Sequence, residues 1–186
     1  MLHPWQIVSS RFVVKDRWLR LRADTCRTHD GRDIDPYYVL EKRDFVHTIP
    51  VLADGRIVLV RQYRHGAQEF CLEFPGGILD DGETPIEGAR RELREECGAV
   101  GGSWSLAAKF FPNPARQTNH FHCFLAEGVT LSAETSFDDN EDLEINIMSV
   151  AEIDAELAGG SFNQATHIAA FLMARPRLLA AEANAG

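Results

Sequence analysis

The sequence predicts an α+β or α/β sandwich, and three observations lead to that class. Short strand patterns come in pairs joined by turns that contain Asp-Gly or a similar pair, which is typical of β-hairpins. One segment in the middle of the chain and two near its end have the residue spacing of helices. Strands that surround two or three helices, and are largely joined by hairpins, pack as a sheet covered by helices.

The first strands are expected between residues 11 and 40. Apolar and charged residues alternate over 19–24, the turn 29–32 contains Asp-Gly, and the chain then runs into the apolar segment 37–40. A second hairpin joins 46–52 to 57–60 through the turn 53–56. Segment 57–60 is apolar on both faces, which predicts a central strand. A further short strand over 70–74 ends at Pro75-Gly76-Gly77.

A helix follows, from Thr84 to the glycine at 98. Glu87 stands three residues after Thr84, the spacing of a capping box, and Pro85 suits the first helical turn. Gly98 is placed where a left-handed residue ends a helix. Strands are then expected over 103–111, 119–126 and 142–149, and helices over 150–158 and 162–174, the last stopped by Pro176.

Composition limits the possible partners and location. The chain has 186 residues, 45% hydrophobic and 25% charged, enough for one domain with a core or a domain with a small appendage. Its formal net charge of −9 gives no long-range attraction for nucleic acids or anionic membranes, and no apolar run is long enough to span a bilayer. We expect a cytoplasmic protein, because a secretory signal pattern is absent at the start and the cysteines are scattered without a C-x-x-C pair: Cys26, Cys71, Cys97 and Cys123.

Three glutamates of the central helix are the candidate chemical centre. Glu92, Glu95 and Glu96 are three and four residues apart, so they project from one side of the helix. Drawn into a groove they would repel one another unless a cation compensated them, and clustered carboxylate oxygens suit hard divalent ions such as Mg²⁺. The alternative is a solvated helix face, with ion pairs such as Arg91 with Glu95.

The spacing of the residues around this helix favours the functional interpretation. Seven identities occur in fixed register with the apolar Leu93, and a chance match of that kind is on the order of one in a million. They are Gly77, Glu83, Arg91, Glu92, Glu95, Glu96 and Gly98. This is the pattern of the Nudix box, G-x5-E-x7-R-E-U-x-E-E-x-G-U, in which U is a bulky aliphatic residue. The one departure is Ala99 at the last aliphatic position, which concerns packing rather than catalysis.

The sequence therefore resembles the Nudix hydrolase superfamily, from roughly Tyr37 to Met173. The runs 60–64 and 71–77, Pro114 and the acidic loop 138–142 are similar to the branch that contains ADP-ribose pyrophosphatases and nucleoside-diphosphate-sugar hydrolases. The resemblance implies a Nudix fold, which is a mixed-sheet α/β/α sandwich over residues 45–186, preceded by a small antiparallel sheet over residues 1–44. Enzymes of this kind commonly dimerise through the N-terminal sheet, so a homodimer is expected.

The resemblance also implies a reaction and a metal. The reaction is the Mg²⁺-dependent hydrolysis of the pyrophosphate bond of a nucleoside diphosphate sugar, with ADP-ribose giving AMP and ribose 5-phosphate, and with Mn²⁺ as a substitute ion. Glu92 and Glu96 would be the main metal ligands, supported by Glu95 and by the backbone carbonyl of Gly76. Arg91 would orient the glutamates.

Five further residues receive roles from the same resemblance. Glu141 is the first candidate for the general base and Asp139 the second. Arg64 matches a phosphate-contacting arginine and Glu73 a substrate-side glutamate. Trp18 could stack on the nucleobase, and a place in the core or a dimer interface is the alternative for this side chain.

Two other functions stay open at this point. The same site could prefer GDP-mannose or another nucleotide sugar, because the motif reads only the diphosphate and the metal. The chain could instead be a nucleotide-sensing Nudix module without catalysis. Loss of glutamates from the motif would indicate such a module, and here all of them are present.

Overall fold

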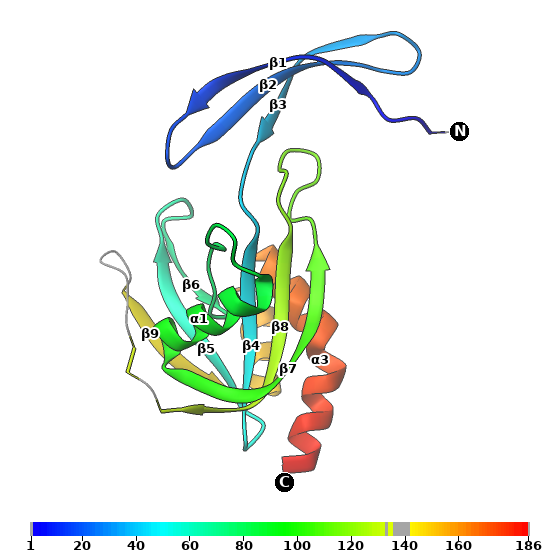
Figure 1. The fold of residues 1–186 in the computed structure, drawn as a ribbon. Coiled ribbons are helices and arrows are strands. Elements are labelled where there is room, and N and C mark those ends of the chain that lie inside the picture. The colour runs from blue at the N-terminus through cyan, green and yellow to red at the C-terminus, as the bar shows by residue number, and fades with distance from the viewer. Residues whose placement is uncertain (1, 133, 136–141, 186) are drawn as a thin grey trace. The chain divides into compact units, whose positions relative to one another are not determined.

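A computed structural model of the chain describes residues 2–132, 134–135 and 142–185 (Figure 1). The contacts within it divide the chain into two compact units. One contains residues 1–44 and 111–120, and the other contains residues 45–110 and 121–186. Segment 111–120, which the sequence interpretation included in the second part of the chain, thus groups with the first. No helix among the described residues is both long and apolar enough to cross a membrane.

The first unit is built on a three-stranded antiparallel sheet in the order β1-β2-β3, which comprises β1 (Gln6–Lys15), β2 (Arg20–Arg27) and β3 (Asp33–Leu40). The turn between β2 and β3 closes where Thr28 N–H donates to the carbonyl of Arg32 (2.9 Å), and Gly31 takes a φ of 84° in it. The hairpin predicted around residues 29–32 is therefore confirmed. β1 begins five residues before the first strand pattern recognised in the sequence.

The second unit contains a six-stranded mixed sheet with the main order β6-β5-β4-β8-β7, while β9 pairs with β5 (Figure 1). Its strands are β4 (Phe45–Leu52), β5 (Ile57–Arg64), β6 (Glu69–Glu73), β7 (Ala99–Phe110), β8 (Phe121–Leu131) and β9 (Leu143–Met148). β4 and β8 are parallel, and the other neighbours are antiparallel. Residues 57–60 of β5 are buried on both faces, as their sequence predicts.

Helices cover both faces of this sheet. Leu93 and Cys97 of α1 (Pro85–Cys97) pack with Val58 and Val60 of β5. Ile57 and Leu59, the alternate residues of β5, pack on the opposite face in a cluster with residues of α2 (Val150–Gly159) and α3 (Ala165–Ala185). The alternation of side chains along a strand thus supplies two apolar layers from one segment. The α/β/α sandwich predicted from the sequence is confirmed.

α3 differs from its prediction. The helix was expected to stop at Pro176, but it continues to Ala185 with Pro176 inside it. A proline removes one helical hydrogen bond and disfavours a helix interior, so other contacts must offset this cost. Leu178 is 1% exposed in the core, and the Glu182 carboxylate accepts a hydrogen bond from Val150 N–H (2.8 Å) at the start of α2. Tertiary packing therefore overrides the local signal.

Candidate active site

The ends of α1 follow from local sequence chemistry. Thr84 is the N-cap, and its backbone N–H donates to the Glu87 carboxylate (2.9 Å) in the predicted capping box. Gly98 ends the helix in the left-handed conformation, with φ 60°. The helix is held in register by Ala89 and Leu93, both fully buried. This register sets the exposure of the three glutamates.

The glutamates differ in exposure. Glu96 is 5% exposed, the Glu92 side chain is 12% exposed and the Glu95 side chain is 42% exposed. They therefore form a strip that begins in the interior, next to the sheet, and ends at the solvent.

The glycine turn before α1 lies directly against this strip. Gly76 N–H donates to the Glu96 carboxylate (2.8 Å). A Cβ atom on Gly77 would come within 2.4 Å of the Glu92 Oε1 atom, and a Cβ on Gly76 would come within 2.1 Å of the Val46 carbonyl oxygen. Gly76 also has a φ of 152°, in the range that favours glycine. Glycine at position 76 thus lets the backbone pack closely against β4, and glycine at position 77 leaves room for the Glu92 carboxylate.

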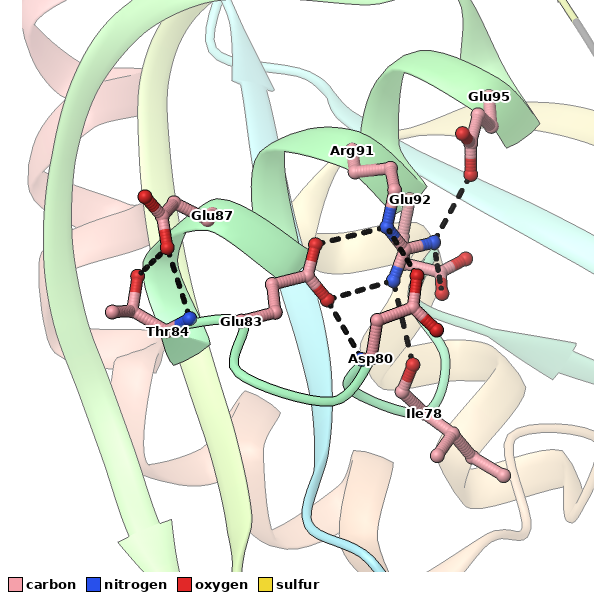
Figure 2. Close-up of polar contacts among 8 residues, drawn as sticks. All are labelled: Ile78, Asp80, Glu83, Thr84, Glu87, Arg91, Glu92 and Glu95. Carbon is pink, nitrogen blue, oxygen red and sulfur yellow. Dashed lines mark hydrogen bonds and ion pairs between the residues drawn. The ribbon is translucent and has the colours of Figure 1, made fainter.

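Arg91 lies at the centre of a charged cluster with Glu83, Glu92 and Glu95, as Figure 2 shows. Its Nη1 donates to Glu92 (2.9 Å) and to Glu95 (3.1 Å), while its Nε and Nη2 donate to the two oxygens of Glu83 (2.9 and 3.0 Å). These bonds raise the pKa of Arg91, with those to Glu83 having the largest effect. The same bonds lower the pKa of Glu83. A single guanidinium thus gathers three carboxylates of the motif.

Glu83 received no role from the sequence beyond its place in the motif. Its carboxylate accepts the backbone N–H of Asp80 (3.0 Å) as well as the bonds from Arg91, so it ties the loop before α1 to the helix. The spacing of eight residues between an acidic and a basic residue was the signal that could have indicated the pair.

The donor atoms of this region suit a hard divalent cation. Carboxylate oxygens of Glu92 and Glu96 lie beside the glycine backbone, which supplies further oxygen atoms. Among the described residues, no group of three histidine, cysteine, aspartate or glutamate side chains lies close enough together to hold a metal ion. Arg91 engages Glu92 and Glu95 instead. The ligand roles of Gly76, Glu92, Glu95 and Glu96 thus stay predictions that the donor chemistry fits.

Arg64 and Glu73 form a bidentate ion pair between β5 and β6. Arg64 Nε donates to Glu73 Oε1 (2.7 Å) and Arg64 Nη2 donates to Glu73 Oε2 (2.5 Å). The Glu73 side chain is 2% exposed, whereas that of Arg64 is 46% exposed. Glu73, predicted on the substrate side, is thus buried beneath the arginine. The pair raises the pKa of Arg64, and Glu96 adds a smaller electrostatic effect in the same direction, which indicates that Arg64 lies near the glutamate strip.

The other predicted residues lie elsewhere. Trp18 belongs to the first unit, in the turn between β1 and β2, where the Asp16 carboxylate accepts the N–H groups of Trp18 and Leu19 (both 2.7 Å). Its side chain is 80% exposed, so a place in the core is wrong. Asp139 and Glu141, the candidates for the general base, lie outside the described residues.

Comparison of the sequence with family models identifies the class of protein that has this fold and this charged cluster. Residues 42–171 match the NUDIX domain, and residues 5–40 match the nucleoside diphosphate sugar hydrolase N-terminal domain. The chain belongs to the Nudix family, whose hydrolases generally use divalent metal ions.

Similar proteins have been given more specific names. The chain is 33% identical to an ADP-ribose pyrophosphatase of Bacillus subtilis over 101 residues, which are 54% of this chain and 55% of that protein. It is 45% identical to an ADP-sugar pyrophosphatase of Mus musculus over 105 residues, 51% of this chain and 48% of the relative. The chain thus spans about half the length of these relatives.

A crystal structure of an ADP compounds hydrolase shares the fold. It superposes with a TM-score of 0.86 at 23% identity, and the match covers 97% of each chain. Both units of the present structure therefore have counterparts in that protein's fold.

Proposed function

We propose that this protein hydrolyses the pyrophosphate bond of a nucleoside diphosphate sugar, with ADP-ribose as its main substrate. The observation that carries the proposal is the contact of the Glu92 and Glu96 carboxylates with the backbone of Gly76 and Gly77. Relatives named ADP-ribose and ADP-sugar pyrophosphatases support the choice of substrate. In the reaction, water adds to one phosphorus, the bridging P–O bond breaks, and the products are AMP and ribose 5-phosphate.

Glu92 and Glu96 would hold the metal, with Glu95 and the backbone carbonyl of Gly76 as further ligands. We propose Mg²⁺, with Mn²⁺ as a substitute, because all of these donors are oxygen atoms. When bound, such an ion neutralises diphosphate charge and lowers the pKa of a coordinated water molecule. Arg91 keeps Glu92 and Glu95 on one side of the helix through its two bonds from Nη1.

The other residues of the proposal bind substrate or move the proton. Arg64 presents a half-exposed guanidinium that can donate to a phosphate oxygen. Glu141, or Asp139 as the second candidate, would accept the proton of the attacking water as general base. Trp18 would stack on the nucleobase with its exposed ring.

Oligomeric state and location belong to the same proposal. We infer a homodimer assembled through the N-terminal sheet, because every residue of β1 is exposed and several of its side chains are large and apolar. A reducing, cytoplasmic environment fits the four cysteines, which are all free and buried.

The test is a panel of nucleotide sugars incubated with Mg²⁺ and then with a phosphatase that releases phosphate from the products. ADP-ribose should give the highest kcat/KM, and removal of the metal with EDTA should abolish the signal. A higher kcat/KM for GDP-mannose or another nucleotide sugar would show that ADP-ribose is not the main substrate. Binding without turnover for every member would favour the nucleotide-sensing module instead.

A further inference from the structure

A buried polar network lies behind the Arg64 guanidinium and has no place in the function described so far. Its centre is Glu73 on β6, which is 1% exposed. Besides the two bonds from Arg64, the Oε1 atom of Glu73 accepts a hydrogen bond from the side-chain amide of Gln164 (2.6 Å). A carboxylate taken out of water needs such partners, since unpaired it would be costly to bury.

Gln164 comes from a distant part of the chain, directly before the first residue of α3. Its carbonyl accepts the backbone N–H of Ile168 (2.9 Å), so its backbone is already part of the first helical turn. The amide therefore approaches Glu73 from a fixed helix terminus rather than from a loop.

His167, on the same helical turn, completes the surroundings of Glu73. Its Nδ1 accepts the backbone N–H of Phe74 (3.0 Å), which leaves the proton of the neutral ring on Nε2, 3.7 Å from Glu73 Oε2. The ring is fully buried and stacks on His47, with 4.0 Å between the ring centroids. Two residues at the beginning of α3, Gln164 and His167, thus lie beside the carboxylate that Arg64 binds.

The bidentate pair passes this constraint on to Arg64. A guanidinium has five N–H donors in a rigid plane, and Glu73 takes two of them. The directions of the other three N–H donors are fixed by the plane that the guanidinium shares with the Glu73 carboxylate. The Arg64 side chain is 46% exposed. If the Glu73 carboxylate rotates, those donors rotate with it, because two parallel bonds fix the relative orientation of both groups.

We propose that Gln164 is a positioning residue, which holds Glu73 and, through it, aims the remaining N–H donors of Arg64 at the diphosphate of the substrate. This inference rests on the proposed function for its substrate. The juxtaposition of Gln164, Glu73 and Arg64 is present without any ligand, so part of the claim can be tested without catalysis.

The kinetic test compares Gln164→Ala with Asn163→Ala. Asn163 is a matched control, because its neighbouring amide contacts a different glutamate, the exposed Glu69 (3.4 Å). Gln164→Ala should raise KM for ADP-ribose about tenfold with kcat changed less than about twofold, since binding to phosphate is lost in the ground state and the transition state alike. Asn163→Ala should keep both values. Equal KM values for the two variants would overturn the inference.

A double-mutant cycle separates positioning from general destabilisation. In an Arg64→Ala background, Gln164→Ala should have no further effect on KM, because the group that it positions is gone. A tenfold effect that persists in this background would show that Gln164 acts on something other than Arg64, and would refute the proposal. Melting temperatures of all variants check that the fold is intact.

The ligand-free test follows the Arg64 Nε–H resonance by NMR, assigned by its loss in Arg64→Lys. In the wild type and in Asn163→Ala the signal should be sharp and slow to exchange with water, since this proton is bonded to Glu73. In Gln164→Ala it should broaden or exchange faster, and an unchanged signal would refute the positioning role. This result is independent of turnover, so a wild-type protein inactive on every nucleotide sugar would remove the proposed function while the NMR data still decide whether Gln164 orders Arg64.

Discussion

Glu96 is distinguished from its neighbours in the glutamate strip by burial and by its bond to the backbone. It is 5% exposed and accepts the N–H of Gly76, whereas Glu92 and Glu95 share the Arg91 guanidinium. If Glu96 is a metal ligand, Glu96→Gln should lower turnover of ADP-ribose by at least about 10²-fold, because the amide removes a charge at nearly unchanged shape. Steady-state kinetics with Mg²⁺ measures this.

The matched control for this change is Glu87→Gln. Glu87 is a glutamate of the same helix that also accepts a backbone N–H, that of Thr84, and glutamine can serve in a capping box. This variant should retain nearly normal turnover. Turnover of Glu96→Gln close to that of the control would contradict the ligand role.

The stacked histidines should make the protein sensitive to mild acid. Burial lowers the pKa of His47 to about 3, with a smaller effect from the positive charge of Arg64, and burial also holds the pKa of His167 well below its usual value. Below about pH 6.5 the unfolded chain binds protons at these positions and the folded chain does not. The free energy of unfolding should therefore decrease as the pH falls from about 6.5 to 5, by about 1 kcal/mol per pH unit for each histidine.

Urea unfolding at several pH values measures this dependence. His47→Phe should reduce the slope, since the phenyl ring fits among the neighbouring rings of Phe45 and Phe121 and has no proton to bind. His65→Phe, at an exposed position, should leave the slope as it is. A His47→Phe variant with the wild-type slope would show that another group causes the acid sensitivity.

At the scale of the element, α3 depends on its C-terminal half for attachment to the core. Leu178 is 1% exposed and Leu179 is 41% exposed, although both follow Pro176 in the same helix. Leu178→Ala should cost about 2–5 kcal/mol of unfolding free energy, because it leaves a cavity in a packed core. Leu179→Ala should change stability by less than about 0.5 kcal/mol. Equal midpoints in urea for the two variants would mean that this part of the helix does not hold the core.

Elements with local signals were predictable from the sequence, and α1 is the clearest case. Its capping residues, its apolar spacing and its closing glycine all lie within fifteen residues of one another. α3 was predicted too short because Pro176 is a strong local signal, whereas Leu178 and Glu182 act through contacts with distant residues. Propensity is a weak guide when tertiary packing opposes it.

The same distinction applies to the site. The motif predicted which glutamates and which arginine come together, and the structure places Arg91 among them. Nothing in the sequence indicated that Gln164 would bond to Glu73, because the two residues are far apart in the chain and amides at helix starts are common. The burial of Glu73 was equally unpredictable, since a charged residue is seldom buried without partners.

At the scale of the whole molecule, the first unit exposes large apolar side chains along one of its strands. Ile7 is 60% exposed, Val8 51% and Val13 44%, all on β1. Exposed apolar patches often mark interaction surfaces. We expect the 20.8 kDa chains to sediment as dimers, and a variant with Ile7→Glu and Val13→Glu to sediment as monomers with unchanged secondary structure by circular dichroism.

Leu106→Glu is the control for this experiment, because Leu106 is 53% exposed but belongs to the second unit. It should remain dimeric. Wild-type protein that sediments as a monomer throughout the micromolar range would contradict dimerisation through β1.

The parallel pairing of β4 with β8 has a consequence for biosynthesis. Phe45 lies opposite Phe121, about 75 residues later in the chain, and the ladder continues to Leu52 opposite Val129. On the ribosome, β4 and its hairpin partner β5 emerge long before β8 does. Until β8 is synthesised, the edge of β4 that will pair with it has no hydrogen-bond partners. Slower elongation would prolong this interval, and the yield of native protein should then depend on chaperones that shield the nascent edge.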